Sequence, residues 1–129
     1  MLGTGDLIAF VPTTDLARAR SFYKSVLGLR LDSEGPFASV FDANGVMLRV
    51  TPVSEVARAP YTVLGWRVTD IVATVRDLTD RGVSFVRYEG MEQDSLVIWT
   101  TPGGDRVAWF TDPDGNTLSV TQFVEAAAR

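Results

Sequence analysis

Residues 7–28 combine the signals of a strand, a turn and a helix, and read LIAFVPTTDLARARSFYKSVLG. The apolar run at the start favours a β-strand, which ends near Pro12. Asp15 is a typical helix N-cap residue, because its carboxylate accepts hydrogen bonds from the unpaired N–H groups of a first turn. Apolar side chains then recur every three or four residues, and Gly28 is typical of a helix C-terminus. This stretch therefore predicts a strand followed by an amphipathic helix.

The same pattern occurs a second time in residues 63–82, which read VLGWRVTDIVATVRDLTDRG. The spacing from Ile8 to Asp15 equals that from Val63 to Asp70, seven residues in both copies. Further along, residues 44–51 align with residues 114–121, and both stretches begin with a turn that contains glycine. An internal repeat of this kind indicates that one structural unit is present twice.

Short apolar or alternating runs after each helix predict further strands. In the first copy they cover residues 29–33, 37–41 and 46–51, and in the second copy residues 83–88, 96–100, 107–111 and 117–123. We interpret each copy as a β-α-β-β-β module, with one additional short run in the second copy, and the fold class is α+β. We place module one at about residues 5–52, a linker at about 53–60 and module two at about 61–124, within a single domain of residues 1–129.

Alternation assigns the strand residues to two faces, since successive side chains point to opposite sides of a sheet. One parity is almost wholly apolar, and we assign it to the face under the helices: Leu7, Ala9, Val11, Val46, Leu48, Val50, Leu64, Trp66, Val68, Leu118 and Val120. The other face is mixed, with Ile8, Phe10 and Met47 beside polar residues. A face open to water should be mainly polar. We therefore expect curvature of the sheet, a subunit or a ligand to cover the mixed face.

The composition excludes several classes of function. The chain has 12 basic and 16 acidic residues, and it has neither histidine nor cysteine. Thiolate catalysis, disulfides and cysteine-type zinc sites are therefore excluded, and the commonest metal ligand is missing. The formal net charge of −4 does not suit nucleic-acid binding. No apolar stretch is long enough to span a bilayer, so we expect a cytoplasmic protein with neither nucleic-acid nor membrane partners.

Two motifs of the sequence resemble motifs of the vicinal oxygen chelate superfamily. This superfamily includes glyoxalases, bleomycin-binding resistance proteins and extradiol dioxygenases. The first motif is the helix of residues 15–29, and the second is residues 109–116, which read WFTDPDGN. The resemblance covers nearly the whole chain. It implies that the two modules form a cup-shaped, mostly antiparallel sheet with the helices on the convex face. It also implies a site on the concave face and a homodimer.

The resemblance further implies where a metal ion would be bound in an enzyme of this superfamily. The four ligand positions, carried over one by one, are Ile8, Arg49, Val63 and Ser119. Two hydrocarbons, a cation and a neutral hydroxyl are poor ligands for a divalent ion. We therefore expect no metal site and no cofactor, and no catalytic residue is identified.

The mixed face combines apolar and aromatic surface with a few polar groups, as small-molecule sites do. Arg49 is the sharpest candidate, because a guanidinium suits carboxylate, phosphate or carbonyl oxygens of a ligand. An ion pair with a loop acid, or a place at the rim, would explain Arg49 equally well. The candidate ligand-binding residues are Ile8, Phe10, Met47, Arg49, Thr51, Val63, Arg67, Trp99, Trp109, Ser119 and Thr121.

Three functional hypotheses follow from the sequence. The first is metal-independent binding of a small, largely apolar or aromatic molecule, as in the drug-sequestering members of the superfamily. The alternative is a glyoxalase-, isomerase- or dioxygenase-like enzyme, a lyase or oxidoreductase with a relocated or absent metal site. In the third, the protein only mediates interactions, and a partner covers the mixed face.

Overall fold

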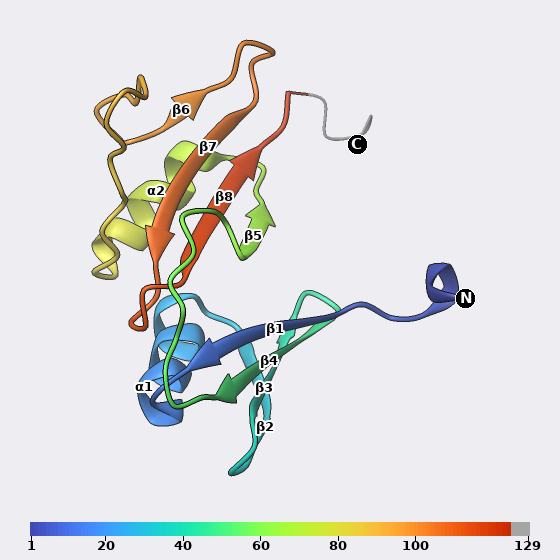
Figure 1. Ribbon diagram of the computed structural model, residues 1–129. Coiled ribbons are helices and arrows are strands. Elements are labelled where there is room, and N and C mark those ends of the chain that lie inside the picture. Colours follow the sequence, from blue (N-terminus) through green and yellow to red (C-terminus); the bar gives the residue numbers. More distant parts are fainter. Residues whose placement is uncertain (125–129) are drawn as a thin grey trace. The chain divides into compact units, whose positions relative to one another are not determined.

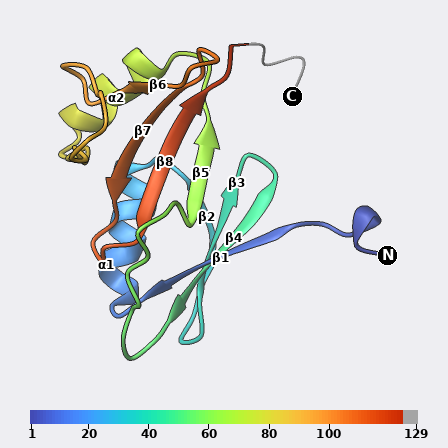
Figure 2. The same cartoon turned by 45° about the horizontal axis from the view of Figure 1, so that its top comes forward.

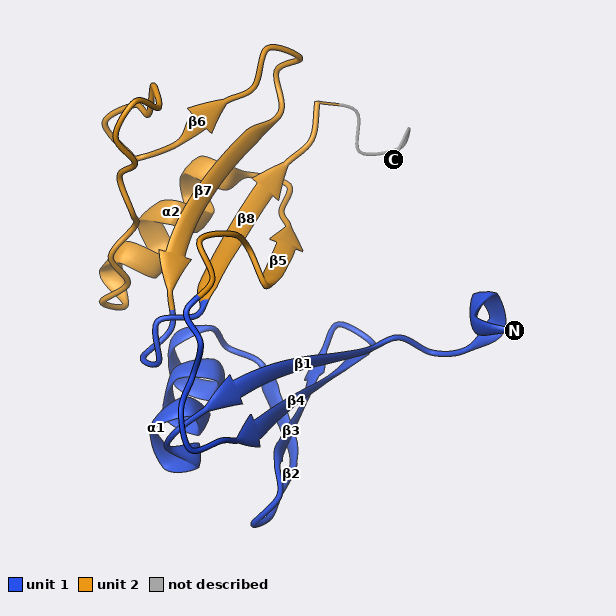
Figure 3. Cartoon of the chain, viewed as in Figure 1, with its two compact units in different colours: residues 1–58, 112–116 blue, residues 59–111, 117–129 orange. Residues whose placement is uncertain are grey.

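The computed structural model describes residues 1–124, and residues 125–129 lie outside the described part. The contacts divide the chain into two compact units (Figure 3). Unit 1 comprises Met1–Arg58 together with Asp112–Asn116, and unit 2 comprises Ala59–Thr111 together with the chain from Thr117 onward. The chain therefore returns to unit 1 for one short turn late in the sequence.

Unit 1 is a four-stranded mixed sheet with one long helical segment, preceded by a short 3₁₀ helix near the start of the chain (Figure 1). Its elements are the 3₁₀ helix η1 (Leu2–Thr4), β1 (Ile8–Thr13), α1 (Leu16–Ser21), the π-helix η2 (Phe22–Val26), β2 (Arg30–Glu34), β3 (Ser39–Ala43) and β4 (Val46–Pro52). The strand order is β1-β4-β3-β2, in which β1 runs parallel to β4 and the other neighbours are antiparallel.

Unit 2 repeats this plan with the strand order β5-β8-β7-β6. Its elements are β5 (Leu64–Arg67), α2 (Ile71–Asp80), β6 (Trp99–Thr100), β7 (Arg106–Thr111) and β8 (Thr117–Gln122). Figure 2 shows β8 between β5, its parallel partner, and β7, its antiparallel partner. The predicted α+β fold of two β-α-β-β-β modules is confirmed, and both sheets are open sheets.

The predicted helix boundaries are confirmed at their caps. The Asp15 carboxylate accepts a hydrogen bond from the Arg18 N–H, and the Asp70 carboxylate accepts one from the Ala73 N–H. Gly28 and Gly82 have φ values of 74° and 95°, the left-handed conformation that favours glycine at a helix end. The first helix differs from the prediction in one respect, because its second half is wound as a π-helix.

The strand predicted at residues 83–88 is wrong. Only an isolated bridge joins Phe85 to Phe110 of β7, and the other predicted strand, at residues 96–100, is reduced to β6. The physical reason is a side chain that takes the hydrogen bonds of a strand partner. The amide of Gln93 accepts from the Tyr88 N–H at 2.7 Å and donates to the Val86 carbonyl at 2.9 Å.

The predicted division of the strands into two faces is confirmed, with one exception. The side chains under the helices form the core, and the following are almost fully buried: Val11, Leu48, Val50, Ala108, Phe110, Leu118 and Val120. Leu7 was assigned to this face and is instead exposed, because β1 begins only at Ile8 and leaves Leu7 without a strand partner. The core of each unit therefore lies between its helix and one face of its sheet.

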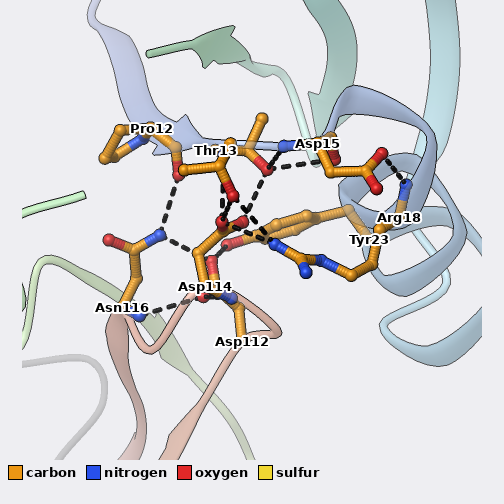
Figure 4. Close-up of polar contacts among 9 residues, drawn as sticks. Pro12, Thr13, Asp15, Arg18, Tyr23, Asp112, Asp114 and Asn116 are labelled. Carbon is orange, nitrogen blue, oxygen red and sulfur yellow. Dashed lines mark hydrogen bonds and ion pairs between the residues drawn. The ribbon is translucent and has the colours of Figure 1, made fainter. Parts of the chain in front are cut away.

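A buried polar network surrounds the carboxylate of Asp114 in unit 1 (Figure 4). The Thr13 hydroxyl donates to Asp114 Oδ2 at 2.5 Å, and the N–H and hydroxyl of Thr14 donate to Oδ1 at 2.9 and 2.8 Å. Arg18 completes the set with a 2.8 Å ion pair. These contacts join the end of β1 and the start of α1 to the 112–116 turn, although Asp114 follows them by about a hundred residues.

Asp112 organises the same turn and reaches a second helical residue. Its Oδ1 accepts from the N–H groups of Asp114 and Asn116, while its Oδ2 accepts from the Tyr23 hydroxyl at 2.8 Å and from the Asn116 amide. The Asn116 amide also donates to the Pro12 carbonyl. These residues therefore do more than hold their own turn together, because they also bind Tyr23 and the end of β1. Within residues 1–124, no buried side-chain nitrogen or oxygen is left without a partner.

The assignment of faces can be tested with two neighbours on β4. Leu48 is 1% exposed and Met47 is 42% exposed. Leu48→Ala leaves a cavity in the core, and we expect it to lower the free energy of unfolding by about 3 kcal/mol. Met47→Ala should change it by less than about 1 kcal/mol. Urea denaturation measures both values, and equal losses would contradict the assignment.

The Asp114 network predicts an acid-dependent stability. Burial by itself would raise the pKa of Asp114, but the hydrogen bonds from Thr13 and Thr14 and the charge of Arg18 lower it below its ordinary value. A lowered pKa in the folded state stabilises the protein above the unfolded pKa of about 3.9, and this contribution is lost as the pH falls through the folded pKa. When the pH falls below about 4, the free energy of unfolding should therefore decrease less for Asp114→Asn than for the wild type. The free energy of unfolding of both proteins is measured from pH 6 to pH 2.5. The same pH dependence in the two would refute the assignment.

Candidate ligand-binding surface

The candidates of unit 1 lie together on the face of the sheet that carries no helix. Ile8 pairs with Met47, and Phe10 pairs with Arg49, in the parallel register of β1 and β4. Thr51 continues the same parity along β4. Phe10 is 59% exposed, and Ile8 and Met47 are exposed too, so they form an apolar surface. No hydrogen bond or ion pair joins the Arg49 guanidinium to any of residues 1–124, so the expected alternative of an internal ion pair is not seen there.

The candidates of unit 2 occupy two neighbouring rows across its sheet. Ser119 of β8 lies between Gly65 of β5 and Trp109 of β7. In the next row, the partners are Arg67, Thr121, Val107 and Trp99, in that order. Ser119 is buried, and its hydroxyl lies so close to Gly65 that a side-chain carbon added at Gly65 would be 3.0 Å from it. Val63 precedes β5 and is exposed.

Three rings, those of Tyr88, Trp99 and Trp109, form an aromatic surface in unit 2. The Trp99 and Trp109 ring centres are 6.1 Å apart with an interplanar angle of 32°, and Tyr88 meets Trp109 edge-to-face at 5.5 Å. The Trp109 indole N–H donates to the Thr62 hydroxyl at 3.2 Å, which fixes the ring orientation. All three side chains are half-buried, so part of each ring is open to solvent.

A shallow hollow of about 210 Å³ borders the Arg67 end of β5. Its lining includes Gly65, Arg67, Thr121 and Phe123. The Arg67 guanidinium lies 4.9 Å from the centre of the Phe123 ring, a cation–π arrangement that holds both side chains in place. Sequence reasoning did not select Phe123, although its position two residues after Thr121 would have placed it on the same face.

The four positions that the resemblance assigns to metal ligands carry side chains that do not fit a metal ion. Ile8 and Val63 have hydrocarbon side chains, Arg49 is a cation, and only Ser119 offers a neutral oxygen. In the described part of the chain, no three aspartate, glutamate, histidine or cysteine residues are grouped so that they could hold a metal ion. No chemistry can therefore be derived from a metal at these positions.

Comparison with known proteins agrees with the geometry. A family model, the Glyoxalase/Bleomycin resistance protein/Dioxygenase superfamily, matches residues 6–120. Among solved structures, a glyoxalase/bleomycin resistance protein/dioxygenase from Alicyclobacillus acidocaldarius is 20% identical, with a TM-score of 0.68 over 95% of this chain and 93% of the other. A lactoylglutathione lyase from Agrobacterium tumefaciens is 21% identical, with a TM-score of 0.64 over 92% and 93% of the two chains.

A third structure, the antibiotic-binding protein TnmS3 from Streptomyces sp. CB03234, is 26% identical, with a TM-score of 0.66 over 92% of this chain and 95% of the other. In residues 1–124, no helix is both long and apolar enough to cross a membrane. The family model spans most of the chain, and the matched residues include both motifs described above. The protein therefore belongs to the glyoxalase/bleomycin resistance protein/dioxygenase superfamily, the vicinal oxygen chelate superfamily that its sequence resembles.

Proposed function

We propose that the helix-free face of unit 2 binds a small, flat and largely apolar molecule without a metal ion. The observation that carries this proposal is the aromatic surface, whose rings are held in place by neighbouring contacts and remain partly open. Flat ligands gain both apolar burial and favourable ring geometry on such surfaces. The Thr121 hydroxyl, on the same face, supplies a polar group that can orient a ligand.

Two further observations support binding rather than turnover. The residues at the superfamily's metal positions offer a single neutral oxygen, so the usual means of polarising a substrate has no ligand set here. The relative at 26% identity is an antibiotic-binding protein, and it shares more than nine-tenths of its length with this chain. Binding that sequesters a small molecule is therefore the better proposal, and an enzymatic function is the alternative.

The unit 1 candidates stay a prediction. The surface of Ile8, Phe10 and Met47 with Arg49 beside it would suit an apolar molecule that carries a carboxylate. Arg49→Ala tests this separately, because it removes the guanidinium and leaves the apolar surface. The homodimer and the cytoplasmic location expected from the sequence also stay predictions.

The aromatic surface can be tested with 2-naphthalenemethanol, a flat and neutral probe, by isothermal titration calorimetry. Trp109→Leu keeps apolar bulk and removes the ring, and we expect a loss of about 1 kcal/mol of binding free energy, or about fivefold in Kd. Phe37→Ala is the control, since Phe37 is an exposed ring in a loop of unit 1. Equal affinities of wild type and Trp109→Leu would contradict the proposal.

A second measurement separates binding from metal-dependent catalysis. The purified protein is dialysed against Zn²⁺, Ni²⁺, Mn²⁺ and Fe²⁺ in turn, and the bound metal is determined. We expect less than stoichiometric metal and an unchanged Kd for 2-naphthalenemethanol. Stoichiometric, tight metal binding together with turnover of a glyoxal, catechol or epoxide substrate would establish the enzyme alternative.

A further inference from the structure

A second hollow of unit 2, separate from the one beside Arg67, lies between the 90–94 loop and β6. It measures about 440 Å³, within the range of small-molecule sites. Its apolar lining comes from Met91, Ile98 and Trp99, and its polar lining from Glu92, Asp94 and Thr100. Trp99 thus belongs both to this hollow and to the aromatic surface.

The loop that borders the hollow is fixed by internal hydrogen bonds. Besides its bonds to residues 86 and 88, the Gln93 amide donates to the Val97 carbonyl at 3.2 Å, and Gln93 forms a backbone bridge with Trp99. The Arg87 guanidinium donates to the carbonyls of Gln93 and Asp94, both at 3.0 Å. A loop held in this way loses little conformational freedom when a ligand binds.

The charged side chains that line the hollow are both acidic. Asp94 Oδ1 already accepts from two backbone N–H groups, those of Leu96 at 2.8 Å and Ile98 at 3.0 Å. Glu92 is exposed, and none of the described residues donates a hydrogen bond or forms an ion pair with its carboxylate. No lysine or arginine lines the hollow. Arg87 is near in sequence, but its guanidinium is used by the loop carbonyls.

Met91, Ile98 and Trp99 favour an apolar or aromatic body, and the open carboxylate favours a positive charge at its edge. An ammonium group is attracted both to a carboxylate and to the face of an indole ring. We propose that this hollow binds an aromatic ammonium compound, with the ring against Trp99 and the protonated amine at Glu92. This inference rests on the proposed function, since the hollow shares Trp99 with the aromatic surface, and it adds that the flat ligand beside Trp99 is a cation.

Three probes that share one ring system test the charge preference: 2-naphthylmethylamine, 2-naphthalenemethanol and 2-naphthoic acid, which are cationic, neutral and anionic at pH 7. Calorimetry at low salt should show the amine binding about threefold to tenfold more tightly than the alcohol. The acid should bind more weakly than the alcohol. In 0.5 M NaCl the advantage of the amine should shrink, because salt screens exposed charges.

Glu92→Gln should remove most of the advantage of the amine and leave the Kd of the alcohol within about twofold. Glu89→Gln is the matched control, since Glu89 is an exposed acid of the same segment that does not line the hollow. The control variant should keep the preference for the amine. Both side chains are exposed, so neither substitution should disturb folding.

Three results would overturn the inference. If the three probes bind equally and Trp109→Leu weakens all of them, the charge preference is wrong while the proposed function stands. If Glu89→Gln removes the preference for the amine as fully as Glu92→Gln does, the overall negative charge of the segment causes that preference. The placement of the amine at Glu92 is then wrong. If no probe binds to the wild type, both the inference and the proposed function are wrong.

Discussion

The carboxylate of Asp114 is the group on which the structure of unit 1 depends. Asp114 as a whole residue is 7% exposed, and a buried charge is stable only when ion pairs and hydrogen bonds replace its lost hydration. Thr13, Thr14 and Arg18 supply these contacts from the end of β1 and the first turns of α1. Unit 1 therefore needs residues 112–116, and its polar interior is complete only when the chain has been made that far.

Local periodicity made the elements of each module predictable. The capping aspartates Asp15 and Asp70 act within their own helical turns, and Gly28 and Gly82 end those helices, so neighbouring residues contain the whole signal. The faces of the strands were predictable for the same reason, because alternation needs only the residues of one strand. The exception, Leu7, marks the limit of this reasoning, since alternation does not show that the pairing of β1 with β4 begins only at Ile8.

Long-range contacts made the rest of the structure unpredictable. Asp42 and Asp112 occupy equivalent places in the repeat, and each accepts a hydrogen bond from the backbone of its own turn. Yet Asp42 is partly exposed, whereas Asp112 is buried against the Tyr23 hydroxyl. The phenol remains neutral there, because burial and the neighbouring Asp112 charge both raise the pKa of Tyr23. The sequence of the turn contains no sign of this partner, which lies about ninety residues earlier.

The same kind of contact explains why the binding features of unit 2 differ from those of unit 1. In unit 1, β2 continues the sheet beside β3 as a strand of five residues, with one shift of register between Leu31 and Ser33. In unit 2, the Gln93 amide bonds with the backbone of residues 86 and 88 and thereby replaces a strand partner. The edge of the sheet next to β6 is consequently a loop, and the loop leaves space beside Trp99. The residue whose amide replaces a strand partner therefore also holds the loop that borders the hollow.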